Sequence, residues 1–232
     1  MVTTRPSRAD ELQGSADKHA EITGFDRQDQ EAFLRKMLNS ESQVEHLQWF
    51  LSKNKMCDLV RVPLLTLFFC LLWKQVKKQL MELIKTKTKL YRAIIRHILQ
   101  YSHKKHSPFP SQISKVKEEN YEDILAEIGK VALEALLTGN HVFEYGQLSE
   151  KVRGEKHLIV GLLQLSEYEE PSLEPMKVVS FIHKSIQEYL VAWYITCRCV
   201  PEGNLGGIEE HVFTLEDCVA LENVFPFVCG LS

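Results

Sequence analysis

The chain has 232 residues, of which 44% are hydrophobic, with 28 basic and 31 acidic side chains. This length allows one large domain or two to three small ones, and the hydrophobic content is ordinary for a globular chain with a buried core. The formal net charge of −3 excludes a protein that binds nucleic acid or anionic membranes through a strong overall basic field.

The cysteines and the longest apolar run indicate a cytoplasmic protein without a membrane span. The six cysteines form no CxxC pair and no Cys/His zinc-finger spacing, so we expect buried free thiols and no metal site. The sequence holds no Asn-x-Ser/Thr sequon and nothing that resembles a signal peptide. The apolar run from Val62 to Trp73 is much shorter than the roughly 20 residues of a membrane span.

The first residues predict a strand that ends at a proline. Met1 to Thr4 carries β-branched residues and is followed by Arg5-Pro6, with no preceding element for it to pair with. The planar guanidinium of Arg5 has a geometry that suits phosphate, and an arginine before a turn suits a surface equally well. Residues 7 to 24 are polar with little periodicity, so we expect a connecting segment there.

Four helices are predicted between residues 24 and 101. Asp26 can cap the first helix, and the second spans about Glu41 to Ser52. Pro63 fits the first turn of the third helix, which is apolar nearly all round, and the fourth spans Thr88 to Tyr101. We interpret the lysine-rich stretch before the fourth helix as a solvated face. The positions expected to face inward in the first, second and fourth helices are Phe33, Leu34, Met37, Leu38, Val44, Leu47, Phe50, Leu51, Leu90, Ile94, Ile95, Ile98 and Leu99.

A new unit is predicted after a loop and domain boundary at Ser102 to Asn120. Its first helix spans about Tyr121 to Leu137 and ends at Gly139-Asn140, and a short extended piece follows from His141 to Tyr145. The inward positions of that helix are Ile124, Ile128, Val131, Ala132, Ala135 and Leu136.

A hairpin is the next predicted element. A partly helical stretch runs to about Leu165, and Leu162 to Ser166 can instead pair with Lys177 to Ile182 around an acidic loop at Tyr168 to Pro175. Residues 201 to 232 hold glycines and a proline, followed by two apolar stretches.

The period of the sequence changes at His183. Val178 to Ile182 is a β-branched and aromatic run typical of a strand, whereas Ile186, Tyr189, Leu190, Trp193 and Tyr194 follow the spacing of a helix face. The first N–H groups of a helix lack intrahelical partners and carry a positive dipole, so His183 could face an anion there. On these residues alone, a packed or capping histidine is the more common role.

Several motifs resemble NACHT-domain NLR (NOD-like receptor) proteins. Phe181-Ile182-His183, followed by Ser185, Gln187-Glu188-Tyr189-Leu190 and Ala192, resembles the winged-helix segment of that family. Thr3-Thr4-Arg5-Pro6 is similar to the final strand of the nucleotide-binding core, and Gly24-Phe25 to the start of the first helical subdomain. Pro63-Leu64-Leu65, with the apolar run and Cys70 after it, looks like a third family motif.

The resemblance implies a mainly α fragment of a NACHT module, with a helical subdomain followed by a winged-helix domain that contains a small β-hairpin. It divides the chain into a core remnant (1–23), a first helical subdomain (24–107), a winged helix (108–200) and the start of a second helical subdomain (201–232). It also implies three ADP/ATP contacts: Arg5 on the γ-phosphate, Pro63 on the adenine ring, and His183 on the β-phosphate of ADP.

The implied function is an ADP/ATP-dependent switch that controls oligomerisation of an intracellular innate immune receptor of the inflammasome type. Its partners would be other protomers and adaptor or effector domains. The chain lacks G-x-x-x-x-G-K-[ST] and an acidic Walker B run, so we expect no catalysis and little or no nucleotide binding by this chain alone.

Two alternatives stay open. The first is a winged-helix protein that binds DNA or RNA, although the helix after Phe181 carries Lys184, Glu188 and several aromatics, with Arg198 only at its end. That composition is typical of a packing helix. The second is a helical adaptor that binds no ligand.

Overall fold

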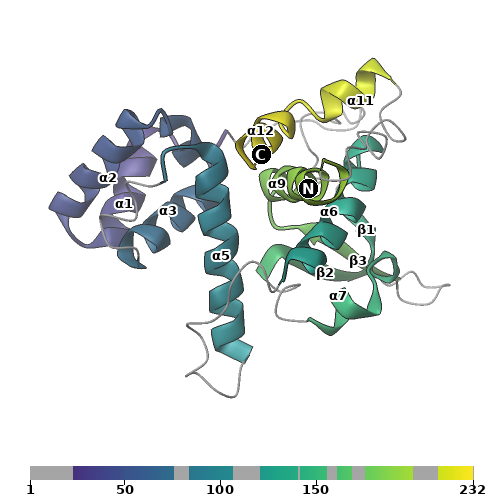
Figure 1. The fold of residues 1–232 in the computed structure, drawn as a ribbon. Helices are drawn as coiled ribbons and strands as arrows, with labels where there is room; N and C mark the ends of the chain where they lie inside the picture. Colours follow the sequence, from purple (N-terminus) through teal and green to yellow (C-terminus); the bar gives the residue numbers. More distant parts are fainter. Residues whose placement is uncertain are drawn as a thin grey trace, which may run out of the picture. The chain divides into compact units, whose positions relative to one another are not determined.

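The computed structural model describes residues 23–75, 84–106, 121–140, 142–155, 161–168, 176–200 and 214–231 (Figure 1). This part of the chain is mainly helical with one small three-stranded antiparallel sheet, which confirms the predicted fold class in its coarse form. The predicted strand at residues 1–4, Arg5 and the acidic loop tip at residues 169–175 lie outside the described residues.

The chain forms two compact units, Met1–Lys74 and Gln75–Ser232. The sequence instead suggested a boundary after residue 107. The predicted fourth helix is α5 (Lys87–His106), which therefore belongs to the second unit. It also continues beyond Tyr101, where the sequence predicted a loop. The finer division into four subdomains stays a prediction.

The first unit consists of short helices whose inward faces follow the predicted apolar stripes. Its elements are α1 (Arg27–Leu38), α2 (Glu41–Lys53), the 3-10 helix η2 (Cys57–Arg61) and α3 (Pro63–Gln75). In α2 all four predicted positions are buried, whereas in α1 only Leu34 and Leu38 are buried and Phe33 and Met37 are half-buried. The spacing of the inward residues was therefore predicted correctly, but the buried stripe of α1 is narrower than predicted.

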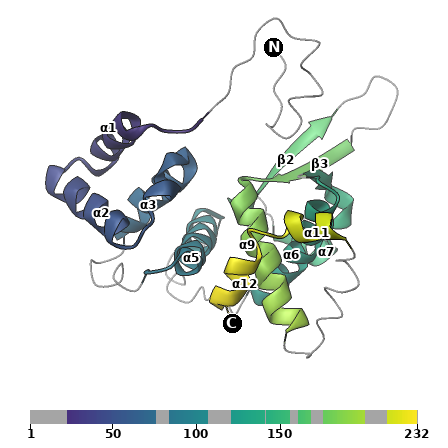
Figure 2. The same ribbon diagram turned by 90° about the horizontal axis from the view of Figure 1, so that it is seen from above.

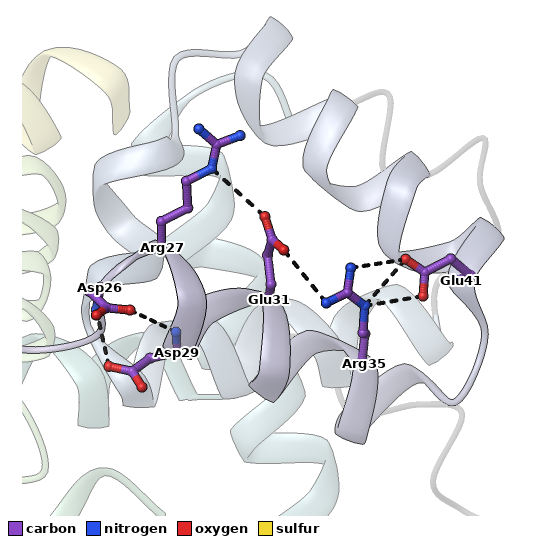
Figure 3. Close-up of polar contacts among 6 residues, drawn as sticks. All are labelled: Asp26, Arg27, Asp29, Glu31, Arg35 and Glu41. Atoms are coloured by element: carbon purple, nitrogen blue, oxygen red, sulfur yellow. Dashed lines mark hydrogen bonds and ion pairs between the residues drawn. The ribbon is translucent and has the colours of Figure 1, made fainter.

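Asp26 caps α1, as the sequence predicted (Figure 3). Its carboxylate accepts a hydrogen bond from the Asp29 N–H at 2.7 Å, and the Asp29 carboxylate accepts one from the Asp26 N–H at 3.3 Å. Further along α1, the guanidinium of Arg35 donates to both carboxylate oxygens of Glu41 at 3.2–3.3 Å. These exposed contacts fix the start of α1 and its turn into α2, although exposed ion pairs contribute little free energy.

The second unit contains the remaining elements (Figures 1 and 2). After α5 these are α6 (Glu122–Leu137), β1 (Val142–Glu144), η5 (Tyr145–Gln147), α7 (Glu150–Gly154), β2 (Leu163–Tyr168), β3 (Met176–Phe181), α9 (Lys184–Tyr194), the π-helical turn η6 (Ile195–Cys199), α11 (Leu215–Ala220) and α12 (Phe225–Leu231).

The predicted stripes on α5 and α6 are confirmed. Every inward position named for these two helices is buried. The end of α6 also follows the prediction: the Gly139 N–H donates to the Leu136 carbonyl at 3.1 Å and the Asn140 N–H to the Ala135 carbonyl at 2.8 Å. Together with a φ of 68° at Gly139, this is the hydrogen-bond pattern of a Schellman motif, and it satisfies two carbonyl groups at the helix end.

The sheet has the strand order β1-β3-β2, with both pairs antiparallel. The predicted hairpin is confirmed, since Leu163 lies opposite Phe181 and Ser166 opposite Val178. The helical interpretation of residues 163–165 is therefore wrong. The short extended piece after α6 is β1, which pairs with the other edge of β3 and places Phe143 opposite Val179.

Helix α9 is buried on all sides rather than along one stripe. Every residue from Ser185 to Trp193 is buried, including Gln187 and Glu188, whereas the predicted inward Tyr194 is only half-buried. Helix α6 packs against it. At the crossing, a Cβ atom on Gly129 would lie 2.2 Å from the Leu190 carbonyl oxygen and 2.8 Å from the Tyr194 Cβ. The α6 backbone therefore approaches α9 as closely as a glycine allows.

The residues after α9 keep its end in contact with α6. The Val200 N–H donates to the Ile195 carbonyl at 3.0 Å, which closes the wide turn η6. The guanidinium of Arg198 in this turn donates to the Asp123 carboxylate in the first turn of α6. Lys151 lies 3.6 Å from the same carboxylate.

We expect Gly129→Ala to lower the free energy of unfolding by about 1–3 kcal/mol, because the added methyl group overpacks the α6–α9 crossing. An exposed glycine in a helix would show the opposite sign, since alanine is the better helix former by roughly 1 kcal/mol. Gly154→Ala is the matched control, because nothing lies within 4 Å of a Cβ atom at that position. Denaturant unfolding of both variants measures the difference. Equal stability of Gly129→Ala and the unmodified chain would contradict the close approach.

Candidate functional site at the strand-to-helix junction

His183 lies where β3 turns into α9, as the change of period predicted. β3 ends at Phe181, and the Ile182 N–H still donates to the Leu162 carbonyl at 3.2 Å, which holds the chain to the hairpin. His183 has an extended backbone, with φ −158° and ψ 143°, and the helix begins at the next residue. The hairpin therefore fixes the position of the histidine relative to the helix N-terminus.

The His183 side chain is the N-cap of α9. Its Nδ1 accepts a hydrogen bond from the Ser185 N–H at 3.1 Å and lies 2.6 Å from the Ser185 hydroxyl oxygen. Because Nδ1 is the acceptor in the cap, we assign the proton of the neutral ring to Nε2. The half-buried ring thus uses one nitrogen for the cap and has its N–H donor on the other. The sequence left open whether His183 packs or caps the helix, and the structure shows that it caps the helix. The contact with a phosphate stays a prediction.

The Gln187-Glu188 pair of the motif is buried beneath this cap. The Gln187 amide is fully buried and donates to the Ala132 carbonyl of α6 at 3.3 Å, so it ties α9 to its main packing partner. The Glu188 side chain is 6% exposed, and its carboxylate lies 3.7 Å from the Lys184 ammonium. A buried carboxylate on a packing helix is an unusual choice unless charged or polar groups surround it.

Burial raises the pKa of Glu188 above its ordinary value, because water no longer solvates the ionised form. The neighbouring ammonium groups of Lys184 and Lys87 and a hydrogen bond with Asn223 oppose this shift without cancelling it. Close by on α5, burial also raises the pKa of Tyr91 to about 12, and the Ser185 hydroxyl opposes that shift in part. The sequence named Glu188 only as part of the motif, and it did not single out Tyr91.

Pro63 lies in the first unit at the first position of α3, as predicted, and it is exposed. The start of α3 is fixed by Thr66, whose hydroxyl donates to the Val60 carbonyl at 2.7 Å. Cys70, which completes the motif, is fully buried, and burial raises the pKa of its thiol to about 11. Cys70 is therefore a packing residue in its protonated form, not a nucleophile.

The cysteine prediction holds only in part. All six thiols are free, as expected, and Cys70 and Cys199 are buried. Cys57, Cys218 and Cys229 are exposed, so the prediction of burial is wrong for these three. They lie in three short helical elements, η2, α11 and α12.

The described residues were also searched for metal sites and for membrane-spanning helices. Among them, no group of three or more His, Cys, Asp or Glu side chains could hold a metal ion. No helix in the described ranges is both long and apolar enough to cross a membrane. Arg5 lies outside those ranges, and Pro63 and His183 belong to different compact units, so the three predicted nucleotide contacts remain separate predictions.

Comparison with known proteins adds no family assignment, since no family model matches the chain and no curated protein matches it significantly.

We expect Glu188→Gln to raise the free energy of unfolding at neutral pH. The pKa of Glu188 is raised in the folded chain, so folding disfavours the ionised form, and the neutral amide removes that cost. The gain should shrink as the pH falls and vanish below about pH 4, where the glutamate is protonated in the unfolded chain as well. Denaturant unfolding between pH 4 and pH 8 measures it.

The exposed Glu134 on α6 provides the control for this prediction. Glu134→Gln removes the same charge from a solvated position, so its stability difference should be small. A Glu188→Gln variant that is less stable than the unmodified chain at pH 7 would mean that the ion pair with Lys184 outweighs the burial of the carboxylate.

Proposed function

We propose that the chain is a regulatory part of an NLR-type intracellular receptor, in which ADP and ATP control a conformational switch. The observation that carries the proposal is the His183 junction, where a hairpin delivers an imidazole to the N-terminus of a buried helix. The imidazole lies at a helix terminus, and that terminus favours negative charge. An ADP β-phosphate is the ligand that the family resemblance assigns to such a histidine.

The order of elements in the second unit supports a winged-helix interpretation. A helix, a short strand, another helix and a hairpin precede α9, and the three strands form one sheet. The packed helices of residues 27–75 suit the first helical subdomain of the same proposal, with Pro63 starting α3. In this scheme ADP bridges the nucleotide-binding core and the winged helix, and exchange for ATP releases the winged helix for oligomerisation.

The burial of α9 favours the switch over the nucleic-acid alternative. A recognition helix needs an exposed face with basic or polar side chains that reach a groove. Nine consecutive residues of α9 are buried, so this helix has no such face. The ligand-free adaptor remains as the competitor, and it differs from the switch in what the Nε2–H of His183 does.

We expect His183→Ala in the intact receptor to raise oligomerisation and signalling without a trigger. A hydrogen bond to a charged phosphate contributes about 1.5–3 kcal/mol, so its loss should shift the closed-to-open ratio by roughly ten- to a hundredfold. The same substitution also removes the cap, which costs about 1 kcal/mol and lowers protein level. Alanine alone therefore mixes two effects of opposite sign on activity.

His183→Asn separates them. Asparagine is among the best N-cap residues, so it keeps an acceptor for the Ser185 N–H and loses the imidazole donor. If His183 binds the phosphate, the asparagine variant should be stable and active without a trigger in an assay corrected for expression. If His183 is only a cap, the asparagine variant should behave like the unmodified receptor, and the proposed phosphate contact would be wrong.

We also expect the 232-residue chain alone to bind ADP only very weakly. The phosphate loop supplies most nucleotide contacts in P-loop proteins, and the sequence lacks that motif. Isothermal titration calorimetry with ADP and Mg²⁺ measures this directly. Tight binding would reveal a nucleotide site made of residues other than those named above.

A further inference from the structure

Three aromatic rings from three separate helices meet in the second unit. They belong to Tyr91 of α5, Tyr189 of α9 and Phe227 of α12, and each is at most 1% exposed. Phe227 lies edge-on to both tyrosines, with ring centroids 4.9 Å from Tyr91 and 5.5 Å from Tyr189. The two tyrosine rings are stacked at 5.9 Å. Such arrangements are favourable beyond the area that they bury.

Two charged groups lie beside these rings, one on α5 and one on α9. The Lys87 ammonium lies 4.6 Å from the Phe227 ring centroid and 6.0 Å from that of Tyr91, within cation–π range. The same ammonium and Asn223, which lies in the turn before α12, both favour the ionised form of the buried Glu188 carboxylate of α9. The segment that ends in α12 therefore contacts α9 by polar groups as well as by Phe227.

A close backbone approach adds a second fixed point between α12 and α5. A Cβ atom on Gly230 would lie 2.1 Å from the Thr88 hydroxyl oxygen and 2.7 Å from its Cβ. Gly230 is three residues after Phe227, so both positions lie on the same face of α12. That face fits against α5 without room for another side-chain atom.

Helix α12 packs against both α5 and α9, which also meet each other directly through the Tyr91–Tyr189 stack and through Arg92 over the Trp193 ring. It contacts each of them more extensively than they contact each other, and Figure 2 shows it beside both. Without α12, the buried rings of Tyr91 and Tyr189 would lose their edge-on partner and become open to water.

We propose that α12 is a latch that holds α5 against α9, so that these two helices separate only when α12 leaves. The device is a conformational lock built from Phe227, the Gly230–Thr88 approach and the Lys87–Glu188–Asn223 contacts. It is contained in the second unit and involves none of the residues proposed to bind nucleotide. The inference therefore does not depend on the proposed nucleotide switch.

Hydrogen–deuterium exchange on the full 232-residue chain tests the latch, with Phe227→Ala and Phe225→Ala as a matched pair. Both remove a phenyl ring from α12, but Phe227 is fully buried and Phe225 is 43% exposed. In Phe227→Ala we expect the amides of α12 and α5 to lose protection together, while α6 and the sheet keep theirs. Phe225→Ala should exchange like the unmodified chain.

Gly230→Ala is a second way to release α12. The added methyl group should displace the helix, while every aromatic ring is kept. It should reproduce the loss of protection in α12 and α5, and Thr88→Ala in the same chain should restore part of it. If α6 and the sheet lose protection together with α5 in both variants, the cluster is an ordinary part of one core. If α12 is released and α5 keeps its protection, α5 is held by other contacts. Either result would overturn the latch.

Discussion

The complete burial of α9 is the constraint on which the second unit depends. The polar groups of a helix that is buried on every side depend on partners within the protein, because water does not reach them. The Gln187 amide donates to the α6 backbone, His183 caps the Ser185 N–H, and the Lys184 and Lys87 ammonium groups favour the charged form of Glu188. The glycine at position 129 lets α6 approach closely enough for the amide contact to form.

This constraint also makes the N-cap residue of α9, His183, important for the structure of the helix. The cap uses Nδ1 of the imidazole, and the proton of the neutral ring is on Nε2. Under the proposed function, a single side chain both holds the helix and binds the ligand. A substitution of His183 can therefore test ligand binding only if the new side chain still caps the helix.

Local patterns were the part of this fold that the sequence could predict. The stripes of α2, α5 and α6, the Asp26 cap, the Gly139-Asn140 stop, the hairpin and the junction at His183 all depend on residues close together in the chain. Pairings between distant segments were missed. The three-residue β1 is too short to predict its place beside β3, and nothing near Phe227 indicates that it meets Tyr91.

The predicted site shows the same limit. The period change located His183, but the identity of its capping nitrogen depends on ring geometry that no spacing specifies. Glu188 appeared only as part of a motif, because its burial results from α5, α9 and the turn before α12 together. Buried acids and rings contributed by several elements are features of the packed chain and not of any one segment.

The π-helical turn at Ile195–Cys199 has a consequence for how this chain compares with its relatives. A turn of this kind contains one residue more than an α-helical turn, which is what a single inserted residue produces in an existing helix. Relatives in which α9 continues without the wide turn should align with a one-residue gap here. Because the wide turn takes up the extra residue, the side chains after it keep the direction that they would have in an uninterrupted α-helix, and an aligned arginine could still face Asp123.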